Sequence, residues 1–263
     1  MKEALVTGAG RGIGRVIAER LAAAPYRVTL VARSEDELEA TAQAIALAGG
    51  EGVAVAADVT APNEVERVFR SAGAPDVLVN NAGSLLAVGT PWQVDADAWW
   101  TDVETSLHGT YLFTRAALPA MLNRGSGTIV NLVSGSALRP EPYTSGYRAA
   151  KAAVATFTED TAAAVAPHGI DVFAVAPGFV DTAMTERLTG TAEGRRWKPE
   201  AQSAQRVDPG LTAELVVRLA SGEARRLSGR FLHALDDLDE LLSRTDEIER
   251  DDLYALRLRR LSR

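Results

Sequence analysis

The chain begins with an apolar segment that runs directly into a glycine-rich turn, and few folds accommodate that order. Residues Glu3 to Thr7 have the composition of a short strand, and Thr7 to Gly14 read TGAGRGIG before an amphipathic helical pattern. Glycines allow the backbone to approach a pyrophosphate, and a helix N-terminus supplies amide donors and a favourable dipole. Strand, glycine turn and helix together predict a dinucleotide-binding loop, with a β-α turn that binds no ligand as the alternative.

Apolar strand-like runs then alternate with helical patterns along the chain. We expect strands at the following ranges: Glu3–Thr7, Arg27–Ala32, Val53–Ala57, Asp76–Asn80, Thr128–Val133, Asp171–Ala176 and Gly229–Ala234. This alternation predicts an α/β fold of the Rossmann type, a doubly wound and mostly parallel sheet with helices on both faces. The sequence contains no internal repeat and no low-complexity linker, so residues 1–263 are interpreted as a single dinucleotide-binding and catalytic domain.

Composition argues against several other classes of protein. A net charge of −7 without a basic stripe argues against a nucleic-acid partner, and the absence of cysteine excludes disulfides and thiol catalysis. The three histidines lie far apart in the sequence, so we expect no metal site. No apolar run is long enough to span a membrane, and the first strand starts too early for a signal peptide. A cytoplasmic protein without a membrane partner is therefore expected.

A second candidate site lies between Ser134 and Lys151, where the sequence reads SGSALRPEPYTSGYRAAK. Tyr147 and Lys151 are four residues apart at the start of an alanine-rich run, so on a helix their side chains share one face. A neighbouring ammonium favours phenolate, and we expect it to lower the pKa of Tyr147 from its usual value of about 10. Ser134 ends the strand-like run TIVNLVS, which would bring its hydroxyl to the same substrate atom. These residue types predict a site that polarises a carbonyl and moves one proton, although the same spacing also occurs on ordinary helix surfaces.

Two further motifs complete an ordered series: Asn80-Asn81-Ala82-Gly83 in the middle of the chain and Pro177-Gly178 after the Tyr-Lys helix. With the glycine turn and the Ser134, Tyr147 and Lys151 set, this series resembles the classical short-chain dehydrogenase/reductase family over about residues 2–234. The resemblance implies a seven-stranded sheet ordered 3-2-1-4-5-6-7. It also implies that Tyr147 donates a proton, Ser134 hydrogen-bonds the carbonyl oxygen, and Lys151 binds the nicotinamide ribose and lowers the tyrosine pKa.

The residue after the second expected strand bears on the choice of cofactor. NAD-selective enzymes of this fold carry an acidic residue there, whereas this chain has Ala32 followed by Arg33, whose planar fork suits a 2′-phosphate. Arg11 in the glycine turn would add a second cation, so NADP(H) is expected in preference to NAD(H), unless both arginines face water. The resemblance implies that Asn81 is structural. It places the cofactor on the following residues: Gly8, Gly10, Arg11, Gly12, Ile13, Gly14, Arg33, Asp58, Val59, Asn80, Ala82, Gly83, Tyr147, Lys151, Pro177, Gly178, Val180 and Thr182.

One position departs from the family pattern V-N-L-x-G. Where that pattern has an asparagine that supports a proton-carrying water chain, this chain has Ser106, within a long helix expected over Asp95–Asn123. The resemblance therefore adds Ser106 to the catalytic set and puts the rate of proton supply in doubt. Ser136 competes for the role of the catalytic serine, but the family spacing of thirteen residues before Tyr147 favours Ser134.

Two segments outside these motifs are also interpreted. Residues 183–205 lack clear periodicity, and in the family such a stretch is a substrate lid. Its run Arg195-Arg196-Trp197-Lys198 would grip an acidic or acyl-carrier substrate, or would simply be solvated. Residues 235–263 carry leucines at helical spacing, which predicts one or two amphipathic helices that pack on the body or on a partner subunit. Relatives often assemble, so a homodimer or homotetramer is expected.

The combined expectation is an NADPH-dependent oxidoreductase that reversibly reduces a ketone or aldehyde to an alcohol. Its partner would be a small-molecule carbonyl or alcohol. Two alternatives stay open: imine or enoyl reduction on the same scaffold, and a protein that binds NADP(H) without turnover.

Overall fold

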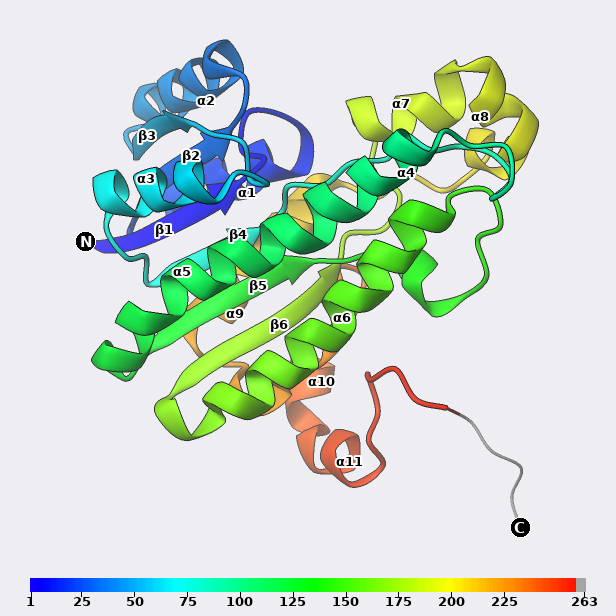
Figure 1. The fold of residues 1–263 in the computed structure, drawn as a ribbon. Coiled ribbons are helices and arrows are strands. Elements are labelled where there is room, and N and C mark those ends of the chain that lie inside the picture. The colour runs from blue at the N-terminus through cyan, green and yellow to red at the C-terminus, as the bar shows by residue number, and fades with distance from the viewer. Residues whose placement is uncertain (259–263) are drawn as a thin grey trace.

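In the computed structural model, which describes residues 1–258, the centre of the fold is a parallel sheet of seven strands (Figure 1). The strands are β1 (Lys2–Thr7), β2 (Tyr26–Ala32), β3 (Glu51–Ala56), β4 (Val77–Asn80), β5 (Gly127–Leu132), β6 (Ile170–Ala176) and β7 (Phe231–His233). They lie in the order β3-β2-β1-β4-β5-β6-β7, and every neighbouring pair is parallel. The predicted fold class and strand order are confirmed, and the strand ends shift by no more than two residues.

Helices cover both faces of this sheet. Successive residues of a strand point to opposite faces, so Ala4 and Val6 of β1 pack in one core cluster and Leu5 packs in the other. The first cluster includes residues of α1 (Gly12–Ala23), α2 (Glu35–Leu47) and α9 (Pro209–Ser221). The second includes residues of α3 (Pro62–Ala72), α5 (Gly109–Arg124) and α6 (Ser145–Val165). Because both faces are buried, the inner strands are near-continuous apolar runs, which explains why the sequence revealed them.

The long helix expected over Asp95–Asn123 is interrupted, and this prediction was wrong in that respect. The chain forms α4 (Ala96–Val103), one π-helical turn (Glu104–His108) and then α5. The side chain of Ser106 lies in the π-helical turn and is completely buried. A π turn adds one residue without changing the apolar character of the sequence, so periodicity alone does not reveal it; such turns are frequent at functional sites.

The two segments without a motif also form helices. Residues 183–205 contain α7 (Ala183–Gly190), α8 (Ala192–Trp197) and a 3₁₀ turn (Pro199–Gln202). After β7 the chain forms α10 (Leu238–Ser243) and α11 (Thr245–Arg250), two short helices where the sequence predicted one or two. Their buried Leu238, Leu241 and Ile248 join the first core cluster. The last part of the predicted extension, 259–263, lies outside the described residues.

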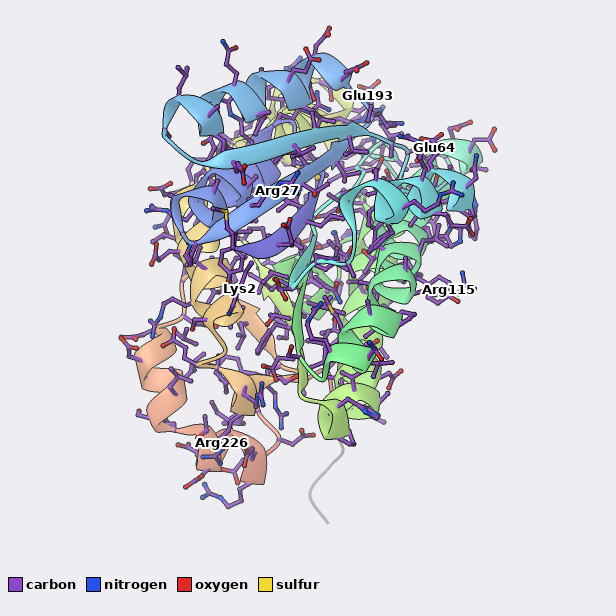
Figure 2. All side chains as sticks on the ribbon, turned by 90° about the vertical axis from the view of Figure 1, so that its left-hand side faces the viewer. Lys2, Arg27, Glu64, Arg115, Glu193 and Arg226 are labelled. Atoms are coloured by element: carbon purple, nitrogen blue, oxygen red, sulfur yellow. The ribbon has the colours of Figure 1, made fainter. Side chains whose placement is uncertain are left out.

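Ion pairs fasten this C-terminal extension to the body. Arg226, labelled in Figure 2, lies beside the extension and pairs with Asp246 and Glu249 of α11 at 2.6 and 2.8 Å. The backbone N–H of Phe231 in β7 donates to the carbonyl of Tyr254 at 2.8 Å, so the chain after α11 returns to the outer edge of the sheet. No helix within residues 1–258 combines the length and the apolarity needed to cross a bilayer.

Candidate active site

The predicted site residues gather at the carboxyl ends of the parallel strands. The glycine turn follows β1, Asn81 follows β4, Ser134 lies just after β5, and Pro177 follows β6. The strand order reverses between β1 and β4, since β2 and β3 extend to one side of β1 while β5, β6 and β7 extend to the other. In open α/β sheets, ligands bind outside the carboxyl ends of the strands at such a reversal.

The glycine turn is closed by contacts that leave no room for side chains. Gly8 has φ +66°, and a Cβ on Gly14 would overlap both the carbonyl oxygen of Gly8 and the amide of Asn81. The Asn81 Nδ2 group donates to the carbonyls of Thr7 and Gly8 at 2.9 and 3.2 Å. Helix α1 starts at Gly12 without a side-chain cap and without an acidic residue in its first turn. Its free N–H groups and positive dipole end suit a pyrophosphate.

The side chains of both asparagines make structural contacts, and they do so in different places. Asn80 is 2% exposed, and its Nδ2 donates to Asn131 Oδ1 at 2.8 Å and to Thr114 Oγ1 at 3.1 Å. Asn80 therefore ties β4 to β5 and α5 in the interior instead of presenting its side chain to a cofactor. Asn81, expected to be structural, holds the glycine turn from across the strand reversal. The alternation of side chains along β4 explains this, because one residue of shift moves a side chain to the other face.

The residues expected around the adenosine half of a cofactor lie after β1, β2 and β3. Arg33 is exposed, and the described part of the chain offers it no ion pair. Arg11 is also exposed, but it pairs with Glu37 at the start of α2, with 3.2 Å between Nη1 and Oε1. Asp58 Oδ1 accepts hydrogen bonds from the N–H and hydroxyl of Thr60, which leaves its second carboxylate oxygen free of the turn. These positions could hold the adenosine half of a nicotinamide dinucleotide.

The two residues expected to hold the nicotinamide carboxamide, Val180 and Thr182, lie after β6. The Thr182 methyl carbon lies 3.2 Å from the point where a Cβ on Gly12 would be, so the segment after β6 closes against the glycine turn. Thr182 also caps α7, and Val180 is buried. The other expected cofactor positions lie along the same edge: Gly10, Ile13, Val59, Ala82, Gly83, Pro177 and Gly178.

Ser134, Tyr147 and Lys151 meet beside this edge. Ser134 Oγ accepts hydrogen bonds from the N–H and hydroxyl of Ser136 at 3.2 and 3.0 Å, so both candidate serines are present in one cluster. Lys151 is 4% exposed, its Nζ donates to the carbonyl of Leu132 at 2.6 Å, and it lies 5.8 Å from the centre of the Tyr147 ring. The predicted stacking on one face of α6 is therefore present.

The expected direction of the Tyr147 pKa was wrong for this structure. Burial raises the pKa of Tyr147, hydrogen bonding to Ser134 acts in the opposite direction, and the charge of Asp102 raises it further. Burial also lowers the pKa of Lys151 to about 8. The cost of placing a phenolate in the interior outweighs the effect of the hydrogen bond to Ser134. Tyr147 is thus held as a phenol, the form that donates a proton.

Gly83 brings Ser106 into the same group. A Cβ on Gly83 would lie 3.4 Å from Ser106 Oγ and 3.5 Å from Lys151 Nζ, so the serine and the amine flank this glycine. The backbone N–H of Ser84 reaches Ser106 Oγ at 3.5 Å. Ser106 Oγ and Lys151 Nζ therefore both lie close to Gly83.

Sequence reasoning missed Asp102, a completely buried carboxylate that acts electrostatically on Tyr147. It lies on α4, three residues after Trp99 and four before Ser106, so the three share one helical face. The signal was present in the sequence as a charged residue in the face that carries Ser106.

An apolar cluster of side chains adjoins Tyr147. A cluster of buried Leu85, Val88, Leu188 and Ala201 packs with Tyr147, Phe179, Met184 and Trp197. The Trp197 ring lies 4.9 Å from that of Tyr143, which joins α8 to the loop after β5. Lys198 does not reach outward: it is 9% exposed and pairs with Glu141 and Glu200. The sequence suggested that Lys198 could bind an acidic substrate, but in the structure Glu141 and Glu200 already bind its ammonium group.

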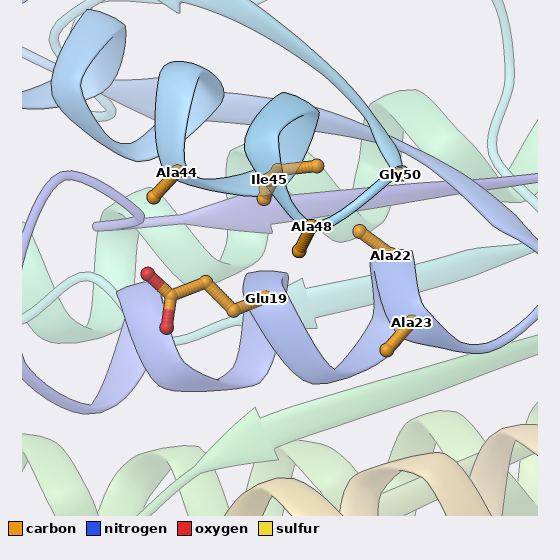
Figure 3. Close-up of a pocket in the computed structure, with 7 residues that line it drawn as sticks. All are labelled: Glu19, Ala22, Ala23, Ala44, Ile45, Ala48 and Gly50. Carbon is orange, nitrogen blue, oxygen red and sulfur yellow. The ribbon is translucent and has the colours of Figure 1, made fainter.

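A separate hollow lies between α1 and α2, near their C-terminal ends and away from the glycine turn (Figure 3). Apart from Glu19, its walls are aliphatic or glycine: Ala22, Ala23, Ala44, Ile45, Ala48 and Gly50. Figure 3 shows the Glu19 carboxylate at one end of this hollow. The lining offers a single polar side chain and no group of catalytic residues.

Comparisons with known proteins agree with this geometry. The profile of a family described as short chain dehydrogenase matches residues 2–193. The short chain dehydrogenase mpl6 of Monascus purpureus is 36% identical over 264 residues, spanning 96% of this chain and 87% of that protein. The 3-oxoacyl-(acyl-carrier-protein) reductase FabG of Staphylococcus aureus is 36% identical over 239 residues, spanning 88% and 96%. A crystal structure of a variant actinorhodin polyketide ketoreductase with NADPH superposes with a TM-score of 0.80 at 34% identity, covering 88% of this chain and 95% of that one.

Proposed function

This chain belongs to the short-chain dehydrogenase family, and from that premise we propose that it reduces a ketone or aldehyde to an alcohol with NADPH. The observation that carries the proposal is the meeting of Ser134, Tyr147 and Lys151 beside the strand ends that would hold the cofactor. Family membership makes it an oxidoreductase that uses a nicotinamide cofactor. The choice of cofactor, the site residues and the substrate class are the proposal.

The nicotinamide supplies the hydride when it is bound. Tyr147 would donate its phenolic proton to the carbonyl oxygen; burial raises its pKa, so the side chain is a phenol at neutral pH. Ser134 hydrogen-bonds the same oxygen and stabilises the negative charge that develops there. Lys151 stays close to Tyr147 and, with a pKa of about 8, can pass on a proton near neutral pH. In alcohol oxidation the same groups act in reverse, with Tyr147 as the base.

NADPH is proposed over NADH because Arg33 follows β2 where an acidic residue would serve NADH. Arg33 is exposed and has no competing ion pair in the described structure, so a 2′-phosphate would gain a charge-assisted hydrogen bond there. The polyketide ketoreductase that this chain resembles was crystallised with NADPH, which supports the same choice.

The substrate is proposed to be a carbonyl compound with a largely apolar or aromatic body. The wall beside Tyr147 is made of aliphatic and aromatic side chains, and the nearest lysine of the lid is neutralised by Glu141 and Glu200. The relatives act on 3-oxoacyl chains and polyketides, whose carbon skeletons fit such a wall. Residues 183–205 would act as the lid over it within one catalytic domain.

A substrate panel followed by the absorbance of NADPH tests this function. It should contain apolar aryl and alkyl ketones, aldehydes, cyclic imines and enoyl thioesters, each with NADPH and with NADH. We expect turnover of ketones or aldehydes that is faster with NADPH. Turnover confined to imines or enoyl compounds would show that the protein is an imine or enoyl reductase and not a carbonyl reductase. Tight NADPH binding without turnover of any class would indicate a binding protein.

A further inference from the structure

Asp102 is an interior charge that the proposed chemistry does not yet use. Its side chain is 0% exposed, and burial of an unpaired carboxylate is strongly unfavourable. Here Oδ1 accepts hydrogen bonds from Ser84 Oγ and the Leu86 N–H, both at 2.7 Å, and Oδ2 accepts one from the Ala87 N–H at 3.0 Å. Within residues 1–258 the side chain accepts three hydrogen bonds and donates none, which is the behaviour of an ionised carboxylate.

The helix that carries Asp102 lies directly against the start of α6. Trp99 Nε1 donates to Ser145 Oγ at 3.1 Å, and the Trp99 carbonyl lies 2.9 Å from where a Cβ on Gly146 would be. Tyr147 is the next residue along α6. Asp102 therefore lies between two parts of the site: the segment Ser84–Ala87 that it binds, and the start of the helix that bears Tyr147.

The segment Ser84–Ala87 forms part of the substrate wall. Leu85 is buried in the cluster that includes Tyr147, Met184 and Trp197. The N–H of Ser84 also reaches Ser106, so one short segment contacts the wall, the π-helical turn and Asp102. Hydrogen bonds from two backbone N–H groups and one hydroxyl fix where this segment lies.

We propose that Asp102 is a positioning residue for the reaction: it anchors the pocket wall Ser84–Ala87 to α4 and keeps a fixed negative charge beside Tyr147. The proposal rests on the proposed function, because it assigns Asp102 a part in the same site. The anchor sets the position of the substrate relative to Tyr147. The charge opposes formation of phenolate, which makes Tyr147 a weaker acid and favours its return to the phenol form after each proton transfer.

The electrostatic part follows from the groups that face Tyr147. Burial is the larger cause of its raised pKa, and the charge of Asp102 adds to it. Lys151 lies on the same helix at 5.8 Å from the ring, and Arg187 of α7 donates to the Leu86 carbonyl at 2.9 Å on the outer side of the anchored segment. Removing the charge of Asp102 leaves these cations unopposed there, so the pKa of Tyr147 should fall.

The experiment compares three variants of the full chain. Asp102→Asn keeps the shape and removes the charge, and its amide nitrogen can no longer accept one of the three hydrogen bonds. Ser84→Ala removes one hydrogen bond and keeps the charge. Asp97→Asn, on the exposed side of the same helix, is the matched control. Measurements are kcat and KM for reduction across pH, and titration of Tyr147 by tyrosinate absorbance after subtraction of a Tyr147→Phe background.

We expect Asp102→Asn to move the alkaline limb of the pH profile and the Tyr147 titration to lower pH, and to raise KM. Ser84→Ala should raise KM by a few-fold without moving either titration, and Asp97→Asn should change neither. An unmoved pH profile and unmoved titration in folded Asp102→Asn would overturn the electrostatic role. An unchanged KM in Ser84→Ala would overturn the proposal that Asp102 anchors the segment Ser84–Ala87. This outcome can be measured even if Asp102→Asn does not fold. The tyrosinate titration needs no turnover, so a wild-type protein without reductase activity would count against the proposed function alone.

Discussion

The cofactor side and the substrate side of the site are built in different ways. On the cofactor side, glycines and strand ends shape the site, and backbone contacts such as those of Gly8 and Gly14 leave no choice of side chain. On the substrate side, side chains from distant parts of the chain hold one another: Asp102 with Ser84, Lys198 with Glu141, Trp197 with Tyr143. Backbone geometry suits a ligand that never changes, whereas side-chain contacts can be altered singly to accept different substrates.

The largest effect should come from the residue where the two sides meet. Tyr147→Phe removes the proposed proton donor, and turnover should fall by about two to four orders of magnitude, the usual contribution of a general acid. NADPH binding, measured by quenching of protein fluorescence, should stay within a few-fold of wild type. Tyr111→Phe on α5, where the ring is 44% exposed, is the matched control. Near-normal turnover of Tyr147→Phe would remove this residue from the mechanism.

A clash placed in the glycine turn tests the cofactor side. The Cβ of Gly14→Ala would overlap the Gly8 carbonyl and the Asn81 amide, so the turn must shift. The N–H groups at the start of α1 would then no longer point at the pyrophosphate. We expect the Kd for NADPH to rise by about tenfold or more, equivalent to at least 1.4 kcal/mol. Gly190→Ala, where a Cβ meets nothing within 4 Å, is the control. Equal NADPH affinity in both variants would place the pyrophosphate elsewhere.

The sequence predicted the cofactor side better than the substrate side, and the contacts explain why. A strand, a glycine turn and a Tyr-Lys spacing are local patterns, readable within a few residues. The Asp102–Ser84 and Lys198–Glu141 pairs join residues 18 and 57 positions apart, and no local pattern relates them. The direction of the Tyr147 pKa depends on burial, which the spacing of Tyr147 and Lys151 does not contain. The interior position of the Asn80 side chain depends on which face of β4 it occupies.

A smaller effect is expected where the cofactor side selects between nucleotides. Arg33→Ala removes the proposed partner of the 2′-phosphate, and a hydrogen bond to a charged group contributes about 1.5–3 kcal/mol. The KM for NADPH should rise by about tenfold or more while that for NADH stays unchanged. This result would show that the Arg33 side chain determines which cofactor is preferred, whereas the backbone of the glycine turn binds either cofactor. Arg27→Ala, at the opposite end of β2, is the control. An equal rise in KM for NADPH and NADH would indicate that Arg33 supports the structure of the site and does not select between the two cofactors.

The smallest effect should come from loosening the substrate side at the lid. Burial disfavours the charge of Lys198, but the hydrogen bonds that its ammonium group donates to Glu141 and Glu200 outweigh burial and raise its pKa, while Lys198 lowers the pKa of Glu200. The contribution of Glu200 is therefore present above its ordinary pKa and is lost as the pH falls through the lowered value. Lys198→Met removes the ion pairs that join the lid to Glu141, which keeps only its contact with Arg139 at 3.3 Å, so the lid should open more often. We expect KM to rise by about two- to fivefold with little change in NADPH affinity. Limited proteolysis within residues 183–205 measures the opening directly, with the exposed Arg195→Gln as the control. If Lys198→Met instead weakens NADPH binding as much as it raises the substrate KM, the lid contributes to both the cofactor side and the substrate side. The two sides would then not be independent of each other.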